Sequence, residues 1–391
     1  MEKMDDLVLL SQMRATRPRI GIVSAWASRL GGGVFEAVIA HAELLSAIGL
    51  EPIVFAPADA HSPVDRARFG KSEVRTFPVR GPAQIGYAPG LLPALLSAGL
   101  DLVHLHGIWM YPSRAASTWA ARTGKPYLIS PHGMLDPWIV SRGKLKKAIA
   151  MAGYERRSWA RAHCFHALTE AEAADIARAT GRRDSIVIPN AVAPSSGDAS
   201  RQPVVTYLGR IHPKKNLHGL LAGWRQSRDV LRPLGARLKI AGWGDATHVD
   251  MLKADIASEA ATDIEFLGPV YGAQKAELIG SSRFVALPSF SEGLPMVILE
   301  AWAAGTPTLM STHCHLPEGY MRGAGIDCGT DADTIARALQ AALALPDREW
   351  RTMSEAATGL VEDRFVPHVV CDRWREALAT LTEAGLRKSA A

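Results

Sequence analysis

Cysteine and long apolar runs are both scarce in this sequence. Four cysteines occur in 391 residues, with no C-x-x-C pair, so neither a disulfide framework nor a cysteine zinc site is indicated. No apolar stretch approaches the roughly 20 residues of a membrane helix, and the run at 7–10 is too short for the core of a signal peptide. We therefore expect a protein of the reducing cytoplasm, soluble or attached peripherally at the inner face of the plasma membrane.

A strong charge of one sign is also lacking. The 44 Lys and Arg residues nearly balance the 39 Asp and Glu residues, which leaves a net charge of +5. Nucleic-acid binding requires a concentrated basic stripe, so we expect no nucleic-acid partner, while an anionic ligand or membrane surface stays open. The length exceeds what one hydrophobic core usually serves, and 48% hydrophobic residues can fill two.

Short β-rich runs alternate with Ala- and Leu-rich helical patterns, which predicts parallel sheets with crossover helices. The runs lie at 20–25, 51–55, 102–105 and 127–130, and again at 204–208, 238–241, 264–267 and 284–287. Between the two series, residues 193–203 have no apolar period and are expected to form a linker. We thus predict an α/β fold of two doubly wound Rossmann-like domains, 1–192 and 204–370, facing a central cleft. A C-terminal helix and tail, 371–391, follows, with packing back on the first domain as one option.

The most informative segment is SFSEGLPMVILEAWAAGTPT, in which seven residues separate Glu292 from Glu300. Gly293 and Pro295 suit a tight loop, and 296–304 is apolar enough for a buried helix. The N–H groups at the start of such a helix suit a phosphate, and Glu300 could accept hydrogen bonds from a ribose. The alternative is structural: Glu300 as a paired buried acid and Glu292 as a carboxylate favoured by the helix dipole.

Three further segments place polar or flexible residues after expected strands. In YLGRIHPKKNL, Arg210 and Lys215 flank a turn and can converge on one anion, although a solvated basic turn is the common alternative. In SPHGMLDPW, His132 is either a structural hydrogen-bonding group or a member of the site. The cluster 31–33 allows close backbone approach to a ligand at a helix start, but it is not a dinucleotide fingerprint and is often only a flexible turn.

These segments together resemble the family 4 GT-B glycosyltransferases, whose signature is the E-x7-E pair. The resemblance implies that Glu300 binds the nucleotide ribose, that Glu292 contacts the donor sugar, and that Arg210 and Lys215 hold the diphosphate. It also implies that His132 contacts the donor sugar. The remaining positions implied to bind the nucleotide sugar are Gly32, Gly33, Gly209, Gly242, Val270, Gly293, Leu294, Pro295 and Met296.

The resemblance implies a retaining, metal-independent enzyme without a cofactor, which moves a hexose from a GDP- or UDP-sugar to a glycan or lipid-linked acceptor in bacterial polysaccharide biosynthesis. A double displacement would need a carboxylate beneath the sugar, and no convincing candidate is present. Two alternatives stay open: a GT-B nucleotide-sugar epimerase or hydrolase, and a non-catalytic nucleotide-sugar-binding subunit. Substitution of Arg210 or Lys215 is expected to cripple turnover without loss of the fold.

Three other segments have competing interpretations. The stretch 142–161 mixes basic and aromatic residues, which fits either anionic lipid or an ordinary solvated helix face. Residues 313–315, His-Cys-His, are not expected to bind a metal, because adjacent residues on a strand point to opposite faces. Asp331 and Asp333 form a D-x-D triplet that we interpret as a helix cap rather than a metal site. Trp243 and His315 depart from the usual family pattern.

Overall fold

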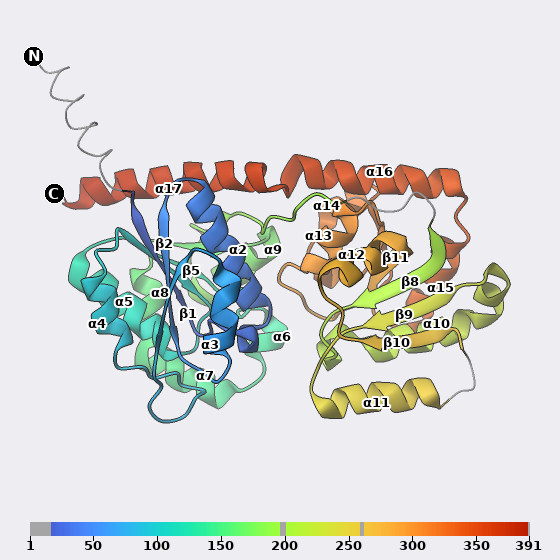
Figure 1. The fold of residues 1–391 in the computed structure, drawn as a ribbon, viewed down its shortest axis with the longest axis horizontal. Helices are drawn as coiled ribbons and strands as arrows, with labels where there is room; N and C mark the ends of the chain where they lie inside the picture. The colour runs from blue at the N-terminus through green and yellow to red at the C-terminus, as the bar shows by residue number, and fades with distance from the viewer. Residues whose placement is uncertain (1–16, 196–200, 259–261, 390–391) are drawn as a thin grey trace, which may run out of the picture. The chain divides into compact units, whose positions relative to one another are not determined.

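The computed structural model describes residues 17–195, 201–258 and 262–389, which form two compact units. One unit contains the chain up to Ile188 together with the residues from Cys371 onward, and the other runs from Pro189 to Val370 (Figure 1). The apolar run at 7–10 and positions 196–200 of the expected linker lie outside the described residues. The C-terminal segment from 371 belongs to the first unit, in which the Trp374 ring lies 4.6 Å from the ring of His41.

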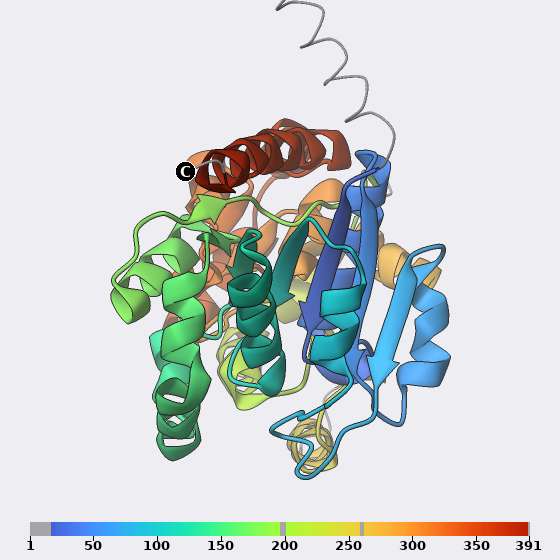
Figure 2. The same ribbon diagram turned by 90° about the vertical axis from the view of Figure 1, so that its left-hand side faces the viewer.

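The described part of the first unit contains a seven-stranded parallel sheet in the order β3-β2-β1-β4-β5-β6-β7. Helices lie on both faces of this sheet (Figure 2). The strands are β1 (Arg19–Ser24), β2 (Glu51–Pro57), β3 (Glu73–Phe77), β4 (Leu102–His106), β5 (Tyr127–Ser130), β6 (Cys164–Ala167) and β7 (Ile186–Val187). The helices are α2 (Gly33–Ala47), α3 (Ser62–Asp65), α4 (Leu91–Ser97), α5 (Tyr111–Thr123), α6 (Pro137–Val140), α7 (Lys144–Ala150), α8 (Arg156–Arg161), α9 (Glu170–Thr180) and α17 (Pro367–Ser389), with a π-helical turn η3 (Met151–Glu155) between α7 and α8.

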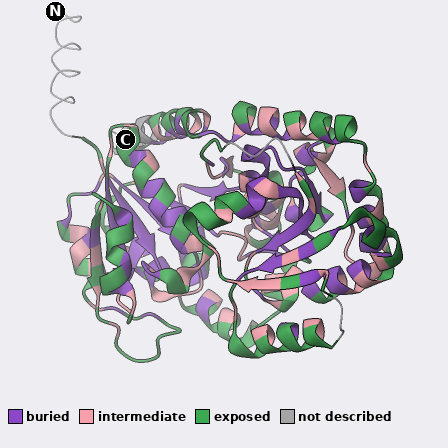
Figure 3. Cartoon of the chain, turned by 45° about the vertical axis from the view of Figure 1, so that its right-hand side comes forward, coloured by how far each residue is buried: buried purple, intermediate pink, exposed green. Residues whose placement is uncertain are grey.

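Two apolar clusters fill this unit, one on each face of the sheet. Side chains alternate along a strand, so Val23 enters one cluster and Ile22 the other. Because both faces are covered, the central strands are apolar almost throughout and buried, as the purple strands in Figure 3 show. Leu381 of α17 belongs to the second cluster.

The described part of the second unit contains a six-stranded parallel sheet in the order β10-β9-β8-β11-β12-β13. Its strands are β8 (Gln202–Leu208), β9 (Arg237–Ala241), β10 (Ile264–Gly268), β11 (Ser282–Leu287), β12 (Thr308–Met310) and β13 (Gly325–Asp327). Its helices are α10 (Leu217–Leu231), α11 (Ala246–Ala257), α12 (Gly272–Ser281), α13 (Met296–Ala303), α14 (Pro317–Met321), α15 (Ala332–Leu343) and α16 (Asp347–Arg364). The chain builds the sheet outward in one direction from β8 and in the other from β11, so the switch point of the topology lies between these two strands. Folds of this kind bind ligands at the switch point, beyond the carboxyl ends of the strands.

The four cysteines are buried free thiols. Among the described residues, no helix is both long enough and apolar enough to cross a bilayer.

Candidate functional site

Glu292 and Lys215 form a mostly buried ion pair in the second unit. They lie in the loop after β11 and in the turn η4 (Pro213–Lys215) after β8, at the carboxyl ends of neighbouring strands. Lys215 Nζ is 2.5 Å from Glu292 Oε1, which also accepts a hydrogen bond from Ser289 Oγ at 2.6 Å. Burial would raise the pKa of Glu292, but the charges of Lys215 and Lys214 and these hydrogen bonds outweigh it and hold the pKa below its ordinary value. Glu292 is therefore an anion at neutral pH.

Backbone and amide hydrogen bonds join the loops that carry this pair. Asn216 caps α10 with a left-handed φ of 56°, a conformation that asparagine adopts more readily than most residues. Its amide Nδ2 donates to the carbonyls of Pro288 at 3.1 Å and Thr330 at 2.7 Å. The N–H of Phe290 donates to the carbonyl of Lys214 at 2.8 Å. The loops after β8 and β11 thus form one connected frame around the ion pair.

Glu300 lies on α13 and lines a pocket of about 310 Å³ within the second unit. Lys275 Nζ of α12 is 2.6 Å from Glu300 Oε1, and both side chains are 29% exposed. The other oxygen, Oε2, is buried and has no hydrogen-bond partner among the described residues. The carboxylate of Glu300 thus keeps an acceptor that no described residue uses.

Residues 293–296 join Glu292 to the start of α13. Pro295 is the N-cap of that helix in an extended conformation, so the helix begins at Met296 as expected. Leu294 is buried, whereas Gly293 and Met296 are half-buried. The N–H of Ile298 donates to the Pro295 carbonyl at 3.0 Å. The N–H groups at the very start of a helix generally lack intrahelical partners and suit an anion.

Gly209 and Gly242 are in close backbone contact. A Cβ at Gly242 would lie 1.9 Å from the carbonyl oxygen of Gly209, so packing between the loops after β8 and β9 requires glycine there. Arg210 is exposed, in contrast to Lys215, whose side chain is mostly buried. Val270, after β10, is half-buried at the same carboxyl edge of the sheet.

His132 follows β5 in the first unit and lies beside His106, the last residue of β4. Nε2 of His132 is 2.9 Å from Nδ1 of His106, and the rings stack with centroids 5.0 Å apart. His132 has a φ of 54°, and the N–H of the following Gly133 donates to Glu172 Oε1 at 2.6 Å. Desolvation, together with the charge of His166, lowers the pKa of His132 to about 3, so the ring is neutral at neutral pH.

Gly32 and Gly33 lie at the amino end of α2. Gly32 is the N-cap, and its φ of 53° strains any side chain other than glycine. A Cβ at either position would meet no atom within 4 Å. The start of α2 is therefore open to a close neighbour.

Two family models match this chain and together span most of both units. The model "Glycosyl transferase 4-like domain" matches residues 32–191, and "Glycosyl transferases group 1" matches residues 202–344.

The chain belongs to the family 4 GT-B glycosyltransferases.

Several curated relatives carry related names. A D-inositol 3-phosphate glycosyltransferase of Gordonia bronchialis is 34% identical over 39% of this chain, but the alignment spans only 35% of that enzyme. A phosphatidyl-myo-inositol mannosyltransferase of Mycobacterium leprae is 27% identical over 75% of this chain and 78% of its own length.

Solved structures share the fold. Anabaena HepE in complex with UDP and glucose has a TM-score of 0.75 at 18% identity, covering 92% of this chain and 99% of HepE. Sucrose-phosphate synthase from Thermosynechococcus elongatus has a TM-score of 0.72 at 19% identity, with 94% and 100% covered. The predicted GT-B fold of two Rossmann-like domains is thereby confirmed.

A buried chain of hydrogen bonds in this glycosyltransferase was missed by the sequence reasoning. His166 Nε2 donates to the carbonyl of Ile188 at 2.8 Å, because a carbonyl can only accept. Neutral His166 therefore accepts from Ser130 Oγ at 2.6 Å, and Ser130 in turn accepts from His104 Nε2 at 2.6 Å. Nδ1 of His104 then accepts from His41 Nε2 at 3.0 Å. The end carbonyl fixes the direction of every proton in the chain.

Three of the histidines, His41, His104 and His106, have ring nitrogens within 4.8 Å of one another. Three imidazoles are a common zinc ligand set. However, His104 already uses both nitrogens in hydrogen bonds, and no carboxylate or thiolate of the described residues joins the group to offset an ion's charge. We therefore interpret the group as a hydrogen-bonded cluster of neutral rings.

The basic segment 142–161 is helical from Lys144 to Arg161, with a π-helical turn in its middle. The π-helical turn η3 separates α7 from α8, and two of its aromatic residues face inward: Trp159 is buried, and Tyr154 donates its hydroxyl hydrogen to the Trp109 carbonyl at 2.8 Å. The exposed apolar residues are instead Leu145 and Ile149, one turn apart on α7.

Two interpretations of short polar motifs can be compared with the structure. Residues 312–314 form a 3-10 turn rather than the expected strand, so His313 and Cys314 do not lie on opposite faces of a strand. Cys314 is buried and its thiol faces the Leu287 carbonyl, 3.5 Å away. Asp331 caps α15, accepting a hydrogen bond from the N–H of Thr334 at 2.9 Å, as expected.

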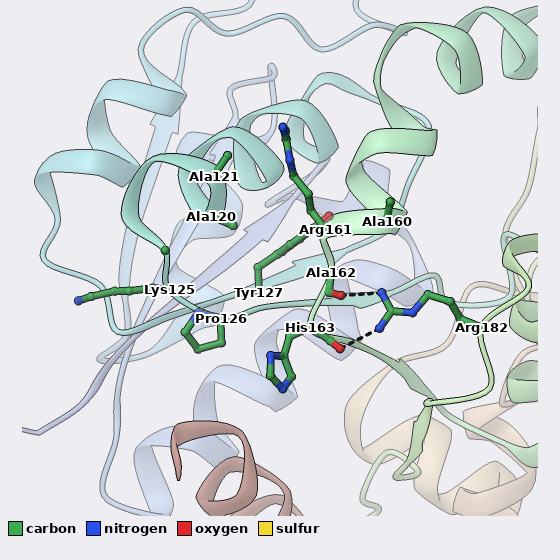
Figure 4. A pocket seen from close by; sticks show the side chains of 11 residues that line it. Ala120, Ala121, Lys125, Pro126, Tyr127, Ala160, Arg161, Ala162, His163 and Arg182 are labelled. Atoms are coloured by element: carbon green, nitrogen blue, oxygen red, sulfur yellow. Dashed lines mark hydrogen bonds between the residues drawn. The ribbon is translucent and has the colours of Figure 1, made fainter. Parts of the chain in front are cut away.

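A larger hollow of about 460 Å³ lies beside the amino ends of β5 and β6 (Figure 4), whereas His132 follows the carboxyl end of β5. Its Arg182 donates to the carbonyls of Trp159, Ala162 and His163 and pairs with Asp184. Because these contacts occupy the guanidinium, we interpret this hollow as a structural feature rather than an anion site.

Proposed function

We propose that this protein is a retaining, metal-independent glycosyltransferase that transfers a hexose from a GDP- or UDP-sugar to a glycan or lipid-linked acceptor in bacterial polysaccharide biosynthesis. The observation that carries the proposal is the carboxylate of Glu300, which lines the pocket of the second unit with one oxygen held by Lys275 and the other without a partner. Such an oxygen suits the hydroxyls of a ribose. HepE, of the same fold, was solved with UDP and glucose, and a relative is named a mannosyltransferase.

In the proposed reaction, the acceptor hydroxyl attacks the anomeric carbon from the side on which the nucleoside diphosphate departs. The acceptor proton passes to the departing phosphate oxygen, so the bond to the acceptor forms as the bond to the phosphate breaks. Arg210 and the amino end of α13 stabilise the charge that develops on the diphosphate, with Lys215 beside them. Glu292 and His132 hold the sugar hydroxyls and thereby orient the reacting carbon.

The exposed face of α7 supports a peripheral contact with an anionic membrane. Leu145 and Ile149 are 76% and 65% exposed, and Arg142 and Lys146 beside them are exposed cations. A helix that presents apolar and basic side chains together can rest on anionic lipid. Sedimentation with vesicles of anionic and of neutral lipid tests this contact; Leu145→Ser with Ile149→Ser should abolish binding to the anionic vesicles, and unchanged binding would refute it.

A two-stage assay tests the function. Thermal unfolding with UDP, GDP and ADP identifies the nucleotide, because a ligand that binds the native state raises its stability. Turnover of the matching sugar nucleotides is then measured with a panel of glycan and lipid-linked acceptors. A glycosylated product supports the proposal; epimerised donor or free sugar in its place supports an epimerase or hydrolase, and binding without any turnover supports a non-catalytic subunit.

A further inference from the structure

His106 has one ring nitrogen in a hydrogen bond and the other without a partner. Its Nδ1 is 2.9 Å from Nε2 of His132, while its Nε2 is buried and has no hydrogen-bond partner among the described residues. The residue is 2% exposed, so no bulk water reaches that nitrogen. Which ring donates the shared proton therefore decides what kind of group is left buried and unpaired.

Only two arrangements of protons are available to two neutral rings in this contact. If His132 Nε2 donates, then His106 must carry its own proton on Nε2, where it would be a buried N–H with no acceptor. If His106 Nδ1 donates, its Nε2 is a bare lone pair, and the proton of His132 is on Nδ1. Buried N–H groups without an acceptor are rarer and more costly in proteins than acceptors that lack a donor.

We propose that His106 is a positioning residue that fixes the tautomer of His132, so that His132 presents an Nδ1–H donor and never an acceptor at that nitrogen. This inference rests on the proposed function only for what the donor contacts, namely a hydroxyl or ring oxygen of the sugar. The tautomer itself follows from the contacts within the first unit.

The backbone around His132 is fixed as well as its ring. Glu172 accepts hydrogen bonds from the N–H groups of Gly133 at 2.6 Å and Leu168 at 2.8 Å, which ties the loop after β5 to the loop after β6. His132 is held in the left-handed region in which few residues other than glycine are found. Glu172 thus sets the backbone, and His106 sets the ring and its proton.

The direct test is nitrogen-15 NMR of the histidine rings in the wild-type protein at neutral pH. The signal of His132 is assigned by its loss in His132→Gln among the 13 histidines of the chain. We expect Nδ1 of His132 to be protonated and Nε2 to be an unprotonated acceptor. A proton on Nε2, or on both nitrogens, would overturn the proposal. Because this readout needs no substrate, it is decided even if the proposed function is wrong.

Variants of His106 add a kinetic readout that a purely structural role would not change. His106→Leu removes the donor and should lower kcat roughly three- to tenfold, the worth of one ordinary hydrogen bond, while affinity for the nucleoside diphosphate without sugar is unchanged. His106→Asn keeps an N–H donor near the same place and should recover most of the loss. His104→Asn, a buried histidine on the same strand that does not contact His132, is the matched control and should leave the His132 tautomer as in wild type. Equal loss in His106→Leu and His106→Asn would contradict the assignment.

Discussion

Lys215 and Glu292 are paired at 2.5 Å, with side chains only 13% and 6% exposed, so the lysine expected to hold the diphosphate already neutralises a buried carboxylate. The two roles are compatible, since an ammonium has three donors and Glu292 Oε1 uses one. Lys215 therefore stabilises the fold by neutralising Glu292. Arg210 is exposed and does not have this structural role.

The first prediction concerns this pair. Lys215→Met leaves the Glu292 carboxylate buried without its partner, so we expect it to lower the free energy of unfolding by about 3–5 kcal/mol. Arg210→Met is the matched control and should change stability by no more than about 0.5 kcal/mol, while both variants lose activity. Urea unfolding measures the difference. The earlier expectation that neither substitution affects the fold is thus kept for Arg210 and revised for Lys215; equal stability of the two variants would restore it.

A second prediction concerns the ribose. Glu300→Gln should weaken binding of the nucleoside diphosphate by roughly tenfold to a hundredfold, because it removes a charged acceptor. A deoxyribose ligand should lose less in this variant than in the parent, as calorimetry can measure. Glu277→Gln, an exposed carboxylate on α12, serves as the control and should leave affinity unchanged. Identical losses for ribose and deoxyribose ligands would remove Glu300 from that role.

A third prediction concerns acid. Desolvation and neighbouring rings lower the pKa of His41 to about 3 and that of His104 well below the ordinary value, and burial lowers that of His166 to about 4. The unfolded chain binds these protons near pH 6.5, so stability is complete above that pH and falls as the pH drops towards the folded pKa values. At pH 5 the free energy of unfolding should be lower by about 2 kcal/mol for each histidine that the fold keeps neutral. The unfolding midpoint should therefore drop steeply between pH 7 and 5, and less steeply in His166→Gln; a flat profile would mean that the folded and unfolded chains bind these protons equally, so that burial does not lower the pKa values of the cluster.

A fourth prediction is that turnover needs no divalent metal. Charge on the departing diphosphate must be stabilised by a bound cation or by fixed positive groups. In this chain Arg210, Lys215 and the amino end of α13 are available, and Asp331 is engaged as a helix cap. Activity should survive exhaustive chelation with EDTA. If EDTA abolishes activity and magnesium or manganese restores it, then a bound ion stabilises the departing diphosphate, and the prediction is wrong.

Apolar runs were enough to predict the central strands. The run 127–130 coincides with β5, and that at 20–25 is one residue displaced from β1. The strands that were missed are short or mixed: β7, β12 and β13 have two or three residues each, β6 has four with His166 among them, and β3, at the edge, carries Glu73 and Arg75. Two or three residues are too few to show the hydrophobic pattern of a strand, and an edge strand need not be apolar on both faces.

Motifs located the carboxyl-end loops but not the contacts within them. The pairings of Glu300 with Lys275 and of His41 with His104 join residues 25 and 63 positions apart, and no local pattern reports them. One signal was available: His104 lies in the expected strand 102–105 and His106 directly follows it, so the two side chains share a face if the strand continues by one residue. With His132 after the neighbouring strand, that spacing could have indicated a histidine cluster.

The configuration of the first-formed product tests the proposed chemistry most directly. The chain offers fixed cations for a departing diphosphate and no carboxylate assigned as a nucleophile, so the acceptor is expected to attack from the departing side. NMR of the new glycosidic linkage, recorded early in the reaction with a sugar nucleotide of known anomeric configuration, should show that configuration unchanged. An inverted linkage would contradict the mechanism.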